Sequence, residues 1–82
     1  MIKIKVLFFA TLKEKAGFRQ MDFELPEGAT ITQLKELILE KYPGLKGTLA
    51  HCLASINHDY RSDESEIPAH AEVAFFPPVS GG

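Results

Sequence analysis

The last two residues of the sequence, Gly81 and Gly82, point most directly to chemistry. Glycine has no Cβ atom, so a glycine pair can pass through a channel too narrow for other residues. We therefore expect the α-carboxylate of Gly82 to be delivered into the active site of another protein, with Gly81 giving the tail its passage. The alternative is an ordinary frayed terminus, which is where disorder is common.

The residues before the glycine pair favour a directed tail over a frayed end. They follow a predicted strand without a linker and begin with two prolines, which fix φ and hold the chain extended. The sequence therefore predicts a ubiquitin-like domain over residues 1–76 and an extended C-terminal tail over residues 77–82. The tail residues expected to contact a partner are Pro77, Pro78, Val79 and Ser80.

A carboxylate is a poor electrophile, so the Gly82 carboxylate must be activated before a nucleophile attacks it. Adenylation by ATP on a partner enzyme would supply that activation. Attack by a sulfur nucleophile would then leave a thiocarboxylate, whereas attack by an amine would give an isopeptide bond. Glycine at the last position suits either route, and the residues alone leave both open.

The other reactive side chains do not form a recognisable site. The three histidines and the single cysteine lack the spacing of zinc ligands, and His51 and Cys52 would face opposite sides of a strand. The sequence has no glycine-rich phosphate loop, and Asp63 and Glu64 are interpreted as loop charges. We expect no active site, no metal ion and no bound cofactor in this chain itself.

Length and composition indicate a small globular domain. The chain has 82 residues, of which 45% are hydrophobic and 24% charged, enough for one small core. The net charge of -2 argues against nucleic-acid binding, and no apolar run is long enough to span a membrane. The N-terminal pattern is not that of a signal peptide, and the lone cysteine forms no internal disulfide, so we expect a cytoplasmic protein.

The alternation of apolar and polar residues predicts the strands that must position the tail. The first two strands are expected to pair as a hairpin with a turn at Ala16 and Gly17. A second turn at Asn57, His58 and Asp59 is expected to join two short strands. The predicted strands cover residues 2–9, 20–25, 52–56, 60–61 and 72–76.

One main helix is predicted between the second and third strands. Thr30 and Gln33 have the spacing of a capping box at its start, and Pro43 stops it. Its apolar stripe is expected to face the sheet, with Lys35 among the residues on the solvent side. Residues 45–51 are interpreted as a loop or a short turn.

This order of elements suits an α+β fold, the β-grasp or ubiquitin-like roll. One helix must cover one face of a mixed sheet, because the apolar faces have nothing else to bury against. The first and last strands are expected to lie side by side in the middle of that sheet. The domain's last strand then leads directly into the tail.

A second apolar surface is expected on the sheet face opposite the helix. Phe9 and Phe76 fall on that face by period-two counting, Leu7 and Ala74 lie beside them, and Tyr60 joins them after the hairpin turn. We interpret these residues as a docking surface because this apolar patch includes the strand that leads into the tail. The alternatives are that a loop covers them or that they are scattered exposed apolar residues.

The sequence resembles a known family, the small, sulfur-carrying subunits of molybdopterin synthase. The resemblance spans the whole chain and is sharpest in residues 6–10 (VLFFA) and 72–82 (EVAFFPPVSGG). It implies a ubiquitin-like fold and a Gly82 that carries the sulfur. It also implies that Phe9 and Phe76 belong to the family's apolar contact surface, together with Tyr60, which stands where an aliphatic residue is common.

The resemblance further implies a set of partner proteins. An adenylating enzyme related to ubiquitin-activating enzymes would use ATP and magnesium to form an acyl-adenylate on Gly82, and a sulfurtransferase system would convert it to the thiocarboxylate. The tail would then enter the large synthase subunit, in an assembly of two small plus two large subunits. There the sulfur would pass to cyclic pyranopterin monophosphate in molybdenum cofactor biosynthesis.

Two other functions remain as alternatives. A sulfur carrier for another pathway, such as thiazole synthesis, is disfavoured by the Phe-Phe-Pro-Pro stretch and the longer chain. A protein modifier conjugated to lysines through Gly82 shares the activation step, so the tail does not exclude it. Covalent adducts on other proteins would favour the modifier, and a stoichiometric complex with one large subunit would favour the carrier.

Overall fold

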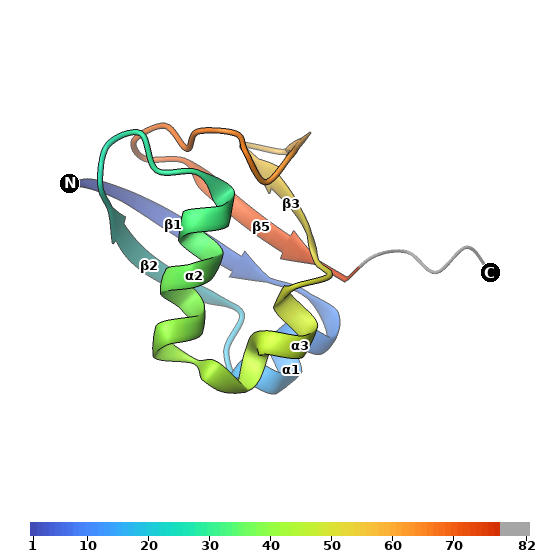
Figure 1. The fold of residues 1–82 in the computed structure, drawn as a ribbon. Helices are drawn as coiled ribbons and strands as arrows, with labels where there is room; N and C mark the ends of the chain where they lie inside the picture. Colours follow the sequence, from blue (N-terminus) through green and yellow to red (C-terminus); the bar gives the residue numbers. More distant parts are fainter. Residues whose placement is uncertain (78–82) are drawn as a thin grey trace.

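The computed structural model describes residues 1–77. Figure 1 shows a twisted sheet with the helix α2 lying across one face. Within the described residues, none of the helices has the length and apolar character needed to cross a membrane.

In chain order the elements are β1 (Ile2–Phe8), α1 (Ala10–Ala16), β2 (Gln20–Leu25), α2 (Ile31–Lys41), the 3-10 turn η1 (Pro43–Leu45), α3 (Lys46–Leu49), β3 (Leu53–Ile56), β4 (Asp59–Arg61) and β5 (Glu72–Phe76).

The sheet has the strand order β2-β1-β5-β3-β4. Its two central strands, β1 and β5, run parallel, with Val6 opposite Val73 and Phe8 opposite Phe75. All other neighbours pair antiparallel. A parallel pair needs a long crossover, which the intervening residues 9–71 supply. The mixed sheet with one main helix on one face confirms the predicted β-grasp roll.

The hydrophobic core lies between α2 and the facing side of the sheet. The alternation predicted for β1 and β5 is confirmed, because Val6, Phe8, Val73 and Phe75 are at most 1% exposed. Burying a side chain of this size contributes about 1.5–3 kcal/mol. The other large, fully buried side chains are Leu12, Leu25, Ile31, Leu34, Ile38 and Leu49.

The main helix begins and ends where the sequence predicts. The Gln33 backbone N–H donates to the Thr30 hydroxyl oxygen at 3.3 Å, and the Thr30 N–H donates to Gln33 Oε1 at 2.8 Å. This capping box satisfies two backbone N–H groups that have no partner within the helix. At the other end the Tyr42 N–H donates to the Ile38 carbonyl, and Pro43 then prevents continuation.

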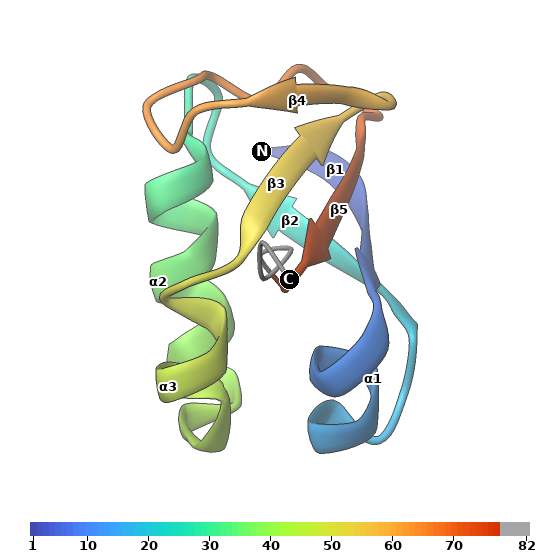
Figure 2. The ribbon, with the colours of Figure 1, turned by 90° about the vertical axis from the view of Figure 1, so that its right-hand side faces the viewer.

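The structure contains two short helices that the sequence does not predict, and they correct the expected turn and loop. The first two strands are antiparallel neighbours as expected, but α1 connects them in place of a simple turn, with Leu12 as its buried residue. The predicted loop over 45–51 contains part of η1 and the helix α3, with Leu45 and Leu49 buried. Helices with one or two apolar anchors are too short to show a 3.6-residue period. Figure 2 shows α1 and α3 near the end of the sheet where β1 and β5 finish.

Candidate functional site

The face of the sheet opposite α2 is divided into a charged half and an apolar half. In the charged half, Lys3 lies opposite Glu24 and Lys5 opposite Asp22 on β2, while Glu72 of β5 flanks Lys5 on the other side. Opposite charges at facing positions favour this strand pairing. The apolar half lies at the C-terminal ends of β1 and β5, where the tail begins.

Three aromatic side chains form a row on this apolar half. The ring centroids of Phe9 and Phe76 are 5.5 Å apart with an interplanar angle of 34°. The Tyr60 ring meets Phe76 edge-on, at 5.7 Å and 67°. Tilted and edge-to-face contacts at these separations are favourable for aromatic rings. The structure therefore brings together the three residues that the sequence selects, and we call them the aromatic row.

The aromatic row is exposed, and one further residue extends it. Phe9 is 44% exposed and Tyr60 74%. Leu53, which is 45% exposed, lies opposite Phe76 in the register of β3 and β5. The sequence pattern does not indicate Leu53, because this residue begins a four-residue strand in which only the first position is exposed. Clustered apolar exposure of this kind marks docking surfaces.

The expected position of Ala74 on this face is confirmed, although Ala74 adds almost no exposed area. Ala74 lies on this face, between Leu7 on β1 and Ser55 on β3, but it is only 7% exposed and Ser55 only 6%. Their side chains are too short to reach the level of larger neighbours such as Phe76 and Tyr60. Ala74 and Ser55 therefore form a floor beneath the aromatic row.

The aromatic row and the start of the tail meet at the end of β5. Phe76 ends the strand and the partly buried Pro77 follows it at once. The aromatic row and the tail are thus adjacent along the chain. The remaining residues of the predicted tail site, Pro78, Val79, Ser80, Gly81 and Gly82, lie outside the described residues.

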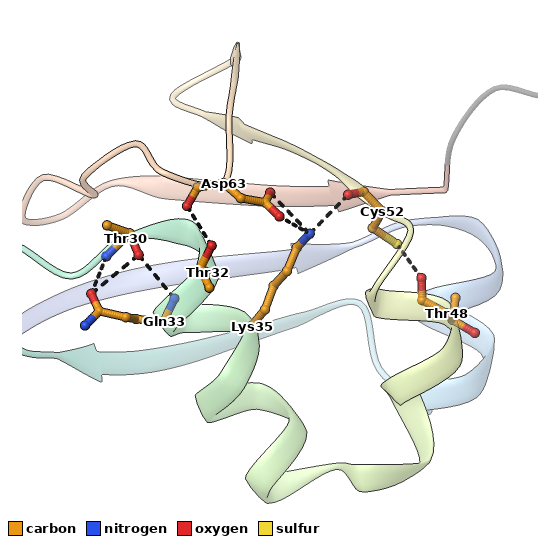
Figure 3. A network of polar contacts seen from close by, with 7 residues as sticks. All are labelled: Thr30, Thr32, Gln33, Lys35, Thr48, Cys52 and Asp63. Atoms are coloured by element: carbon orange, nitrogen blue, oxygen red, sulfur yellow. Dashed lines mark hydrogen bonds and ion pairs between the residues drawn. The ribbon is translucent and has the colours of Figure 1, made fainter.

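Lys35 is predicted on the solvent side of α2, but the structure buries it to 8% exposure. Its Nζ donates to both carboxylate oxygens of Asp63, at 3.0 and 3.2 Å, and to the Cys52 carbonyl oxygen at 3.3 Å (Figure 3). A buried ammonium group requires such partners. Asp63 is therefore an ion-pair partner and not a simple loop charge.

The contacts of this ion pair join three segments of the chain. Besides its carboxylate, Asp63 offers its backbone carbonyl oxygen, which accepts from the Thr32 N–H at 2.9 Å. The Cys52 carbonyl that Lys35 binds directly precedes Leu53. The start of α2, the loop after β4 and the start of β3 are thereby held together.

Cys52, the single cysteine, is a buried structural residue, as the sequence indicates. Cys52 is buried, and its thiol donates to the Thr48 carbonyl oxygen at 3.2 Å. Burial raises the pKa of the thiol above 9.0, and the positive charge of Lys35 opposes part of that rise. The thiolate required of a nucleophile is therefore disfavoured. Among residues 1–77, no group of three or more His, Cys, Asp or Glu side chains is arranged to hold a metal ion.

Comparison with known proteins identifies relatives over nearly the whole chain. The ThiS family matches residues 6–82. A molybdopterin synthase sulfur carrier subunit from Chlamydomonas reinhardtii is 36% identical over 83 residues, which cover 99% of this chain and 100% of the relative. The match includes the tail as well as the sheet.

Solved structures show the same fold. A putative molybdopterin converting factor, subunit 1, from Pyrococcus furiosus has a TM-score of 0.87 and 31% identity, covering 96% of this chain and 100% of its own. Small archaeal modifier protein 1 from H. volcanii has a TM-score of 0.88 and 23% identity with the same coverages. A complex of subunits 1 and 2 of molybdopterin-converting factor from Helicobacter pylori 26695 contains a chain with a TM-score of 0.70 and 23% identity, covering 99% of this chain and 100% of that one. The two likenesses at 23% identity establish the fold alone.

Proposed function

The chain belongs to the ThiS family, and from that premise we propose that it serves as the sulfur carrier subunit of a molybdopterin synthase. The observation that carries this proposal is the position of the aromatic row, an exposed apolar surface on the strand that leads into a Gly-Gly tail. Relatives that bear this name match the chain along its full length.

The proposed chemistry takes place at the α-carboxylate of Gly82. An adenylating partner transfers AMP from ATP to that carboxylate, with magnesium, and releases pyrophosphate. A sulfurtransferase system then supplies sulfur, AMP leaves, and a thiocarboxylate remains. On the large subunit the thiocarboxylate sulfur attacks cyclic pyranopterin monophosphate and joins the two through an acyl–sulfur bond. Water then hydrolyses that bond, which leaves the sulfur on the pterin and returns the Gly82 carboxylate. A dithiolene contains two sulfur atoms, so two transfers are needed for each product.

The proposed docking surface is the aromatic row. Exposed aromatic residues in close mutual contact are typical anchors of protein interfaces. Contact at Phe9, Tyr60 and Phe76 would fix the point from which the tail departs, and six residues from Pro77 to Gly82 reach about 20 Å when extended. The name of the Helicobacter pylori complex describes such an assembly of two subunits. We propose a large-subunit partner for this chain as well, in an assembly of two small plus two large subunits.

Intact-protein mass spectrometry tests this function. The chain is incubated with a cognate adenylating enzyme, ATP, magnesium and a sulfur source. The expected result is a mass gain of one oxygen-to-sulfur exchange, located at Gly82 by fragmentation. ATP-dependent adducts to lysines of other proteins, without that exchange, would instead identify a protein modifier.

A further inference from the structure

Ala10, the first residue of α1, has an unusual backbone conformation. Its φ angle is +53°, in the left-handed region, where the Cβ atom crowds the backbone of any residue other than glycine. Ala10 is exposed, so its methyl group is not required for packing. Strained conformations of this kind persist only where surrounding contacts fix them, and they are frequent at functional sites.

The residue before it, Phe9, is held by its backbone on both sides. The Phe9 N–H donates to the Phe75 carbonyl oxygen at 3.3 Å, and the Phe9 carbonyl oxygen accepts from the Leu12 N–H at 3.2 Å. Phe9 itself is extended, with φ -122° and ψ 156°. These two hydrogen bonds connect Phe9 to the last strand and to α1.

The side chains of Phe9 and Leu12, which precede and follow Ala10, lie in different environments. Phe9 lies on the outer face of the sheet against Phe76, whereas Leu12 is 0% exposed in the core. The chain must therefore change direction between them within two residues. The left-handed backbone at Ala10 is where it turns. A right-handed Ala10 would also permit the hydrogen bond from the Leu12 N–H to the Phe9 carbonyl oxygen, as in a type I turn, but it would change the direction of the chain between Phe9 and Leu12.

We propose that Ala10 is a positioning residue for the aromatic row, because its left-handed backbone holds the Phe9 ring against Phe76. The proposed role of Ala10 is exerted through the Phe9 ring. Leu12 is fixed in the core and Phe8 in the sheet, so a different backbone at Ala10 displaces the half-exposed Phe9 ring first. The inference rests on the proposed function only in treating Phe9 as a contact for the large subunit.

The test compares two substitutions of Ala10 that differ in their tolerance of the left-handed region. Ala10→Val introduces a β-branched residue that avoids it, whereas Ala10→Asn introduces one that accepts it. The nuclear Overhauser contact between the Phe9 and Phe76 rings should disappear in Ala10→Val and remain in Ala10→Asn. This readout needs no partner, so it tests Ala10 independently of the proposed function.

Binding to the purified large subunit of molybdopterin synthase supplies the second readout. Ala10→Val should weaken binding by about tenfold, a central value for the loss of one interface anchor, while Ala10→Asn binds like the unmodified chain. In a Phe9→Ala background, Ala10→Val should cause no further loss, because the two changes then act through the same ring. Where Ala10→Val does not fold, Ala10→Leu takes its place, since a bulky side chain also avoids the left-handed region.

Three results separate the possible failures. Retention of the ring contact in Ala10→Val would overturn the role of Ala10. An equal loss of affinity from Ala10→Val with and without Phe9 would also overturn it, by showing a general effect on α1. If Phe9→Ala binds the large subunit as tightly as the unmodified chain, Phe9 is not a contact. The proposal that Ala10 sets the binding surface then fails together with that part of the proposed function.

Discussion

Phe9 packs against Phe76 at the end of the sheet, with 5.5 Å between ring centroids, although the two residues come from opposite ends of the domain sequence. The parallel pairing of β1 and β5, with Phe8 opposite Phe75, brings the rings together. The aromatic row therefore exists only in the folded domain. Folding thus places the proposed docking surface next to the start of the tail.

Phe76→Glu should weaken partner binding far more than it weakens the fold. Phe76 is the central ring of the aromatic row and is only partly buried. A charge there should cost about 2 kcal/mol or more of binding free energy, as for other interface anchors, but about 1 kcal/mol or less of unfolding free energy. Calorimetric titration with the large subunit and thermal melting measure the two quantities. Lys3→Glu, on the charged half of the same face, is the control and should bind normally. A large fall in the melting temperature of Phe76→Glu would place the ring in the core instead.

Deletion of Gly82 should abolish sulfur loading and leave the fold intact. Phe75 is the last residue of the core among the described residues, so we expect the core to tolerate removal of Gly82. The melting temperature should stay within about 2 °C, because a loss of 1 kcal/mol would already lower it by about 4–8 °C in a domain of this size. Circular dichroism and the mass assay check the two halves of this prediction. A truncated chain that unfolds would show that the tail contributes to the domain.

Lys35→Met should destabilise the domain without touching the aromatic row. The substitution leaves Asp63 without its ion pair and removes the donor to the Cys52 carbonyl oxygen (Figure 3). Loss of the hydrogen bond to the buried Cys52 carbonyl oxygen costs about 1–3 kcal/mol. The ion pair adds little, because the Asp63 side chain is 50% exposed and its charge is screened by solvent. Urea unfolding of the variant measures this cost, with the exposed Lys46→Met as the matched control. Equal stability of the two variants would mean that the contacts of Lys35 contribute nothing net to the unfolding free energy.

Cys52 should make the fold less stable at alkaline pH. Burial raises the pKa of its thiol above the ordinary 9.0, so the unfolded chain loses the proton first as pH rises. The stabilising effect of the neutral thiol is therefore fully present below pH 9.0 and is lost as pH rises through the folded-state pKa. The unfolding free energy of the unmodified chain should fall relative to Cys52→Ala between pH 8 and pH 10. A difference that does not change with pH would contradict an altered thiol pKa.

Regular patterns in the sequence predict the parts of the fold that have a clear period. Alternation places Val6, Phe8, Val73 and Phe75 in the core, and the spacing of Thr30 to Gln33 locates the start of α2. The same alternation puts Phe9 and Phe76 on the outer face, and the structure confirms it. The face on which each of these residues lies follows from the local geometry of its strand or helix, and the order of residues in the sequence determines that face.

Residues whose environment depends on distant segments are not predictable in this way. Lys35 occupies a polar position of the helix, but Asp63, far along the chain, supplies the charge that allows its burial. Ala74 has the right face, but its burial depends on the size of the side chains around it. The turn at Ala10 arises because Phe9 and Leu12 are held by different parts of the fold.

A single-turnover reaction tests the central claim most directly. Thiocarboxylated chain is mixed with the large subunit and cyclic pyranopterin monophosphate, and both the chain and the pterin are followed by mass spectrometry. The account predicts that the chain returns to its carboxylate mass as sulfur appears in the pterin, with two chains consumed for each dithiolene. A thiocarboxylate that stays intact in the presence of large subunit and precursor would contradict the account.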